Sequence, residues 1–285
     1  MKPLTIHRYG NSNARTAVLV HGLTEAGTTW PDLVGHWADD WHVLAPDLRG
    51  HGQSPRFTED ELATAPEVLL ADVIAVLDAQ SEPVVLVGHS LGGLLALRAA
   101  IARPDRVWAL VLEDPARPTG GRTPDPGFVA QNEDFLDAMA DQPGQVALML
   151  RTSTWSRAEI DAWAACKPLV DRTYIRSGLY LGDDAWEELF EALRVPTLLL
   201  VPVDAPMAPR QEALHNDLVR TVVVPGAGHC VRRDQPATYL QAVDAFLAEV
   251  APTSQARDEE KLDEIGSSPQ SDKDEQVRTR GTQTT

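Results

Sequence analysis

Cysteine is scarce in this sequence, and two other common features are missing. The 285 residues include two cysteines, Cys166 and Cys230, too few for a disulfide framework, so we expect a reduced, cytoplasmic setting. No apolar run approaches the ~20 residues that a membrane-spanning helix needs. The first residues also lack the charged start and apolar stretch of a signal peptide. We therefore expect a cytoplasmic protein that does not interact with membranes.

Basic residues are outnumbered by acidic ones. The chain has 25 Lys and Arg against 42 Asp and Glu, a formal net charge of −17. This charge opposes non-specific attraction to nucleic acids and to anionic lipid surfaces. It also disfavours a polyanionic substrate, so the expected partner is a small, neutral or apolar molecule. The hydrophobic share of 43% is typical of a globular protein with a sizeable core.

Short runs of aliphatic and β-branched residues alternate with helical patterns. Runs this continuously apolar are typical of strands that are covered on both faces. We predict strands at 4–9, 17–20, 42–45, 84–87, 107–112, 197–201 and 221–224, and helices at 66–80, 91–102 and 236–250. The alternation predicts a three-layer α/β sandwich with a mostly parallel sheet.

Two segments break this alternation. Residues 116–194 open with many turn residues, continue with helical patterns and hold half of the aromatic residues, which indicates a helical cap or lid. Residues 252–285 are mostly polar and charged, so we expect a disordered acidic tail. The predicted core is then 1–115 plus 195–251.

The clearest chemical signal is the motif G-x-S-x-G around Ser90. It directly follows the predicted strand at 84–87 and precedes the predicted helix at 91–102. A sharp strand-to-helix turn of this kind holds a serine in strained geometry with its hydroxyl exposed at a helix N-terminus. Ser90 is therefore the candidate nucleophile.

A serine nucleophile needs a base and an acid that orients the base. His229 follows the last predicted strand in a glycine-containing turn, which makes it the candidate base. Two carboxylates end predicted strands, Asp204 and Asp114. The chain order Ser90, Asp204, His229 matches the serine–acid–histidine order of this architecture. We favour Asp204, with Asp114 as the alternative acid.

The same reaction needs N–H donors for the tetrahedral oxyanion. One should be the backbone N–H of Leu91, the residue after the nucleophile. The other should come from the loop after the strand at 17–20, where we expect the backbone N–H of Leu23, with Thr24 as the fallback.

Four motifs in this order resemble the α/β-hydrolase fold family, in particular its serine-nucleophile, cap-bearing members similar to esterases and lipases. They are HGL at 21–23, DLRGHGQS at 47–54, GHSLGG at 88–93 and GAGH at 226–229. The resemblance implies a structural role for the loop 47–54 and a cap at 116–194. The sequence departs from the family in two places. The turn before Asp204 is Val-Pro-Val, where members usually have glycine, and a single N-terminal strand replaces a hairpin.

The resemblance and the residues together predict a serine hydrolase that cleaves an ester or related acyl bond of a small, largely apolar substrate. The mechanism requires no cofactor and no metal. Fold alone does not fix the reaction. A carbon–carbon bond hydrolase or a cofactor-free haloperoxidase or perhydrolase could use the same triad, and a non-catalytic ligand-binding protein could use the same fold.

Overall fold

The computed structural model describes residues 2–118 and 125–252. Within these ranges, the predicted apolar runs form a seven-stranded sheet. Its strands are β1 (Ile6–Gly10), β2 (Arg15–Val20), β3 (Trp41–Pro46), β4 (Val84–His89), β5 (Val107–Glu113), β6 (Thr197–Pro202) and β7 (Val219–Val224). Each strand overlaps one of the predicted runs, with the boundaries differing by a few residues.

The strand order is β1-β3-β2-β4-β5-β6-β7. All neighbouring strands are parallel except β1, which pairs antiparallel with β3. Helices cover both faces of a parallel sheet, so its central strands must be apolar on both sides. Every residue of β4 is accordingly buried. The predicted three-layer α/β sandwich with a mostly parallel sheet is confirmed.

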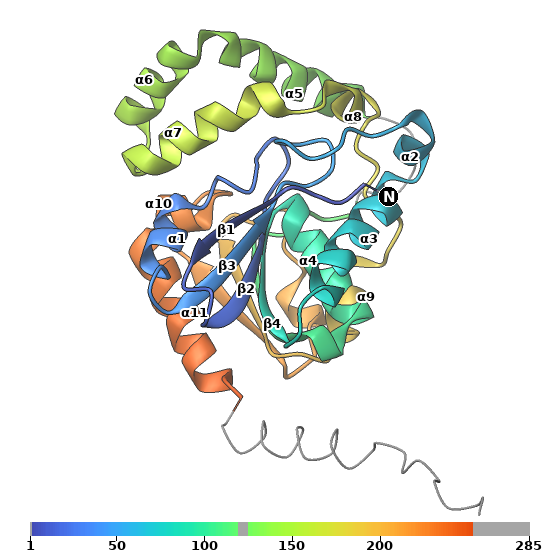
Figure 1. Ribbon diagram of the computed structural model, residues 1–285, viewed down its shortest axis with the longest axis vertical. Helices are drawn as coiled ribbons and strands as arrows, with labels where there is room; N and C mark the ends of the chain where they lie inside the picture. Colours follow the sequence, from blue (N-terminus) through green and yellow to red (C-terminus); the bar gives the residue numbers. More distant parts are fainter. Residues whose placement is uncertain (1, 119–124, 253–285) are drawn as a thin grey trace, which may run out of the picture. The chain divides into compact units, whose positions relative to one another are not determined.

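Alternate side chains of the strands divide the core between the two faces of the sheet. Val18 and Leu86 pack against α3 (Ala65–Asp78) and α4 (Leu91–Ala102). Their neighbours Leu19 and Val87 pack on the opposite face, against α1 (Pro31–His36) and α11 (Pro236–Val250). Figure 1 shows these helices on the two sides of the sheet. Two short helices, α2 (Glu59–Ala63) and α10 (Val231–Asp234), complete this part of the chain.

In the segment between β5 and β6, the described residues form helices and their connecting loops but no strands. The helices are α5 (Pro126–Ala138), α6 (Gln142–Thr152), α7 (Arg157–Cys166), α8 (Arg172–Arg176) and α9 (Trp186–Glu191). Helices α5, α6 and α7 lie together at one end of the sheet (Figure 1). Small apolar clusters form around Ile175 and Trp163, whereas Trp186 and Phe190 join the core on the α4 side. The aromatic residues of this segment are thus shared between its own packing and the main core.

Residues up to Val250 form one compact unit, helices α5 to α9 included. The predicted division into a core at 1–115 plus 195–251 and a cap at 116–194 stays a prediction. Beyond Pro252, the predicted tail lies outside the described residues. Among the described helices, none has the length and apolar character needed to cross a lipid bilayer.

Parallel strands place their carboxyl ends at the same edge of the sheet, which is where ligands bind in α/β folds. The residues that follow β2, β4 and β5 are neighbours at this edge, because β4 pairs with both other strands. These residues are, in the same order, the predicted oxyanion loop, Ser90 and Asp114.

Candidate active site

Ser90 lies in the tight turn between β4 and α4 with a strained backbone, φ 52° and ψ −119°. A non-glycine residue keeps such a conformation only where its surroundings hold it there. The N–H of Ser90 donates to the carbonyl of Glu113 at 3.0 Å, and its carbonyl accepts from the N–H of Ala116 at 2.9 Å. A Cβ atom at Gly92 would lie 2.1 Å from the carbonyl oxygen of Val20. The turn therefore needs glycine at this position in order to pack against β2.

His229 pairs with Asp114. Its Nδ1 lies 2.7 Å from Oδ2 of Asp114, which is 2% exposed, whereas the His229 side chain is 43% exposed. Asp114 follows β5 directly, and its N–H donates to the carbonyl of Leu200 on β6 at 2.9 Å. The buried carboxylate thus fixes one edge of an accessible imidazole. This arrangement leaves Nε2 of His229 as the nitrogen that could exchange a proton with a nucleophile.

The favoured acid, Asp204, is not the partner of His229 in this structure. It lies exposed in the turn after β6, and the carboxylate that contacts His229 is that of Asp114. Strand β5 lies next to β4, so its end lies beside Ser90, whereas β6 is one strand farther from Ser90. The loop of His229, which follows β7, passes the end of β6 to reach Asp114 at the end of β5. The alternative that the sequence offered is the one the geometry favours.

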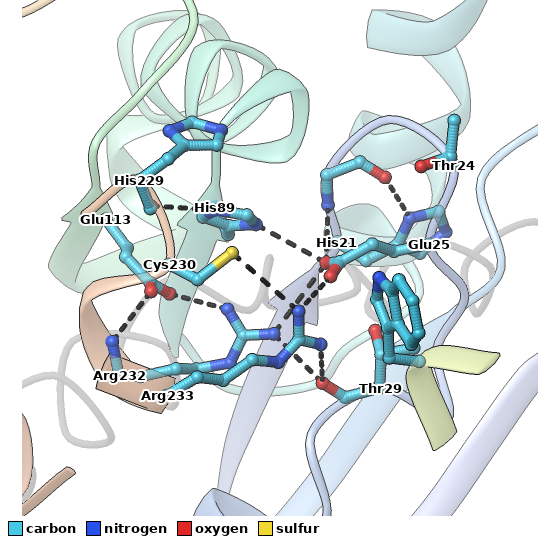
Figure 2. Close-up of polar contacts among 12 residues, drawn as sticks. His21, Thr24, Glu25, Thr29, His89, Glu113, His229, Cys230, Arg232 and Arg233 are labelled. Carbon is cyan, nitrogen blue, oxygen red and sulfur yellow. Dashed lines mark hydrogen bonds and ion pairs between the residues drawn. The ribbon is translucent and has the colours of Figure 1, made fainter. Parts of the chain in front are cut away.

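The turn at Ser90 and the loop of His229 meet through His89. The Nε2–H of His89 donates to the carbonyl oxygen of His229 at 3.2 Å. The two imidazole rings are 4.8 Å apart between centroids. Figure 2 shows His89 directly beneath His229, with its other nitrogen directed towards Glu25. The side chain of His89, the residue before Ser90, therefore links the turn of the nucleophile to the loop of the base.

The loop after β2 holds the peptide between Gly22 and Leu23 in one orientation. The carbonyl of Gly22 accepts from Nδ1–H of His21 at 2.8 Å and from the N–H of Glu25 at 3.2 Å. In a trans peptide, the N–H points opposite to the carbonyl, so that of Leu23 is directed away from both donors. Gly22 itself lies against the nucleophile, since a Cβ atom there would be 3.2 Å from Cβ of Ser90.

The fallback donor, Thr24, is already engaged. Its N–H donates to Nε2 of His51 at 3.3 Å, and Thr24 has a left-handed backbone with φ 60°. In the described part of the chain, the N–H groups of Leu23 and Leu91 make no recorded backbone hydrogen bond. Leu91 begins α4, where the first N–H groups have no partner inside the helix. The geometry therefore favours Leu23 and Leu91 as the oxyanion donors.

Two neutral histidines support this loop. The N–H of Leu48 donates to Nε2 of His21 at 2.9 Å, and Thr24 donates to Nε2 of His51. Both nitrogens accept, so both rings are uncharged. Burial lowers the pKa of His21, and burial together with His21 lowers that of His51 to about 3. The loop 47–54 thus has the structural role that the resemblance implied. Asp47 adds to it by accepting from the N–H of Gly27 at 2.7 Å.

His89 differs from these two histidines because both of its nitrogens face acceptors, the carboxylate of Glu25 and the carbonyl of His229. Such a ring must carry two N–H groups and a positive charge. Burial opposes this charge, but Glu113, Cys230 and Glu25 favour it and raise the pKa of His89 to about 10.

The charge on His89 predicts a pH dependence of stability. In the unfolded chain the pKa is near 6.5, so its contribution is complete below that pH and is lost as pH rises towards 10. We expect thermal melts of the wild type to show a falling midpoint between pH 7 and pH 10. The fall should be smaller in His89→Gln and unchanged in His215→Gln, which removes an exposed histidine. Equal slopes in all three proteins would contradict the assignment.

Comparison with known proteins identifies the family of this chain. A sequence model of the α/β hydrolase family matches residues 17–242. The chain belongs to the α/β hydrolase family. It is 38% identical over 173 residues to lipase LipV of Mycobacterium tuberculosis, a match that spans 59% of this chain and 58% of the lipase. It is 28% identical over 248 residues to esterase YbfF of Escherichia coli, spanning 82% of this chain and 94% of the esterase.

Solved structures of the α/β hydrolase family share the fold. The enol-lactonase from Burkholderia xenovorans superimposes with a TM-score of 0.67 at 21% identity, over 86% of this chain and 96% of the lactonase. At this level of identity the likeness concerns the fold alone. Across the described ranges, no group of three or more His, Cys, Asp or Glu side chains is arranged to hold a metal ion.

Several buried charged residues around this α/β hydrolase site were not predicted from the sequence. Glu25, Glu113, Arg232 and Arg233 are all at most 5% exposed. Charged side chains are buried only when they are paired, and their partners come from distant parts of the chain. The one local signal was the adjacent pair Arg232 and Arg233, which comes shortly after His229.

Proposed function

We propose that the protein is a serine hydrolase that cleaves an ester or related acyl bond of a small, largely apolar substrate. One observation carries this proposal. His229 is held by the buried carboxylate of Asp114 at 2.7 Å, and its loop contacts the strained turn that presents Ser90. A nucleophile, a base and an orienting acid are the three groups that such a reaction requires.

In the first half of the reaction, the hydroxyl of Ser90 attacks the substrate carbonyl and its proton passes to Nε2 of His229. Asp114 accepts the Nδ1–H of His229 and stabilises the imidazolium that forms. The backbone N–H groups of Leu23 and Leu91 donate to the oxyanion. The imidazolium then protonates the leaving alcohol, and the acyl group remains on Ser90.

In the second half, His229 takes a proton from water as the water oxygen attacks the acyl carbonyl. The imidazolium then returns this proton to Oγ of Ser90 as the acyl–oxygen bond breaks, which releases the acid and restores the free enzyme. The same two N–H groups stabilise the second oxyanion. All of these steps use the chain's own groups.

Two observations support the substrate class. The net charge of −17 disfavours a polyanionic substrate. The relatives named lipase and esterase, at 38% and 28% identity, favour an ester bond. The chain spans 58% of the length of the lipase that it matches.

A substrate panel tests the proposal. We expect the purified protein to hydrolyse p-nitrophenyl esters, with activity depending on acyl length, and expect Ser90→Ala to be inactive on each of them. The panel includes lactones, a diketone for carbon–carbon cleavage and a peracid assay. Faster diketone cleavage or peracid formation would favour the alternative reactions on the same triad. Tight ligand binding without any product would favour a non-catalytic protein.

A further inference from the structure

Behind the candidate active site lies a cluster of six buried ionisable side chains, which we call the buried ionic cluster. Its members are Glu25, His89, Glu113, Glu159, Arg232 and Arg233, each at most 5% exposed. Three carboxylates face two guanidinium groups and the imidazolium of His89, so the charges balance. Figure 2 shows most of this cluster, with the arginines between Glu25 and Glu113.

Glu25 contacts three different loops of the site. Its Oε2 accepts from the N–H of Gly22 and faces Nδ1 of His89, both at 3.4 Å. Its Oε1 accepts from Nη1 of Arg233, and Arg232 lies 3.7 Å from Oε2. Gly22 precedes the predicted oxyanion donor, His89 precedes Ser90, and the two arginines follow His229. One carboxylate therefore joins the segments that carry the oxyanion donor, the nucleophile and the base.

The cluster also reaches the acid of the proposed triad. Arg232 donates from its N–H to Oε1 of Glu113 at 2.9 Å and from Nη1 to Oε2 at 2.8 Å. Glu113 is the residue before Asp114. The segment after His229 is thus tied to the end of β5, which Asp114 follows directly.

Arg233 extends the cluster to helix α7. Its Nε donates to Oε2 of Glu159 at 2.7 Å, and its guanidinium lies 4.7 Å from the ring centroid of Trp155. Oε1 of Glu159 accepts from the N–H of Asp32 at 3.2 Å. Helix α7 is therefore connected to the loop of His229 through buried charges.

Such a cluster is a poor way to gain stability, because removing charges from water costs about as much as their pairing returns. Its groups do fix the loops firmly, since each charge has partners on several segments and none can move alone. Burial opposes the charge of Glu25, but Arg233 and His89 keep its pKa well below the usual range. Glu25 is therefore ionised in the folded protein near neutral pH.

We infer that Glu25 is a positioning residue for the proposed hydrolysis. Its carboxylate fixes the relative positions of the oxyanion loop, the turn of Ser90 and the loop of His229. Arg233 and Glu159 extend this constraint to α7. The inference rests on the proposed function. Displacing reacting groups by about 1 Å can cost on the order of 10²-fold in rate. Loss of the Glu25 charge should therefore lower kcat while leaving KM nearly unchanged.

The test compares Glu25→Gln with Asp72→Asn. Gln has the shape of Glu without the charge. Asp72 lies on α3, where it forms a buried ion pair with Arg49 at 2.8 Å. It contacts none of the loops that carry the triad. We expect Glu25→Gln to lose on the order of 10²-fold in kcat with KM within about threefold of wild type. Asp72→Asn should lower the melting midpoint and keep the wild-type kcat.

A second variant, Glu159→Gln, keeps the inference testable if Glu25→Gln does not fold. It alters the far end of the connection and should lower kcat by a smaller factor. Where Glu25→Gln folds, the effects of the two substitutions on kcat should be less than additive in the double variant, because both act through Arg233. A folded Glu25→Gln or Glu159→Gln with wild-type kcat would overturn the inference. Wild-type activity in Ser90→Ala would instead overturn the proposed function, and the inference with it.

Discussion

Replacing Ser90 by alanine is expected to lower kcat/KM for ester hydrolysis by on the order of 10⁴- to 10⁶-fold. The hydroxyl is the only group in the proposed mechanism that forms a covalent bond with the substrate. Steady-state kinetics on p-nitrophenyl esters measures the loss, and circular dichroism checks that the variant is folded. Alanine adds no bulk at the turn and keeps a Cβ at the strained position, so we expect the fold to persist.

Ser153→Ala is the matched control for this experiment. Ser153 lies at the end of α6, where its hydroxyl donates to the carbonyl of Met149 at 2.8 Å, and it takes no part in the proposed chemistry. Its removal should leave kcat/KM at the wild-type level. Activity in Ser90→Ala close to that of Ser153→Ala would show that another group performs the reaction.

Replacing Asp114 by asparagine is expected to lower kcat by about 10⁴-fold, the effect typical of an orienting acid in such a triad. The amide of asparagine would no longer accept the Nδ1–H of His229 as a carboxylate does, so the ring loses its orientation and the support for its positive charge. The comparison variant is Asp204→Asn. It should keep the wild-type kcat, because Asp204 is exposed and lies in the turn after β6.

Kinetics of the two asparagine variants on one ester, measured side by side, decides between the acids. A large loss in Asp204→Asn together with a small loss in Asp114→Asn would reverse the assignment. It would mean that the loop after β6 moves onto His229 during turnover.

The layers of the fold could be predicted because burial leaves a local trace in the sequence. A strand covered on both faces must be apolar throughout, as in 84–87, and the resulting β4 is buried at every residue. Helix α4 is almost entirely apolar, and its predicted bounds coincide with those observed. The helix predicted at 236–250 also coincides with α11, whose apolar residues recur on one face.

The acid could not be chosen from the sequence because the choice depends on which carboxylate the loop of His229 reaches in the folded chain. Asp114 and Asp204 both end a strand and both lie between Ser90 and His229 in the chain. Only the folded chain shows that the loop of His229, after β7, reaches past β6 to the carboxylate of Asp114. Both aspartates therefore fit the serine–acid–histidine order along the chain.

The buried ionic cluster could not be predicted for a related reason. Glu25 and Arg233 are 208 positions apart in the chain, yet their side chains form a hydrogen-bonded ion pair. A charged residue is by default exposed, and the adjacent pair Arg232 and Arg233 is the one local signal of this burial in the sequence. Long-range pairing of this kind becomes visible only when the loops after β2 and β7 are seen together.

The central claim is that Ser90 is an activated nucleophile, and covalent labelling tests it most directly. The wild type is incubated with a fluorophosphonate at neutral pH, and the modified peptide is identified by mass spectrometry. We predict a single adduct on Ser90 that is absent in Ser90→Ala, forms more slowly in Asp114→Asn and forms at the wild-type rate in Asp204→Asn. Folded wild-type protein that gains no adduct at Ser90 would contradict the claim.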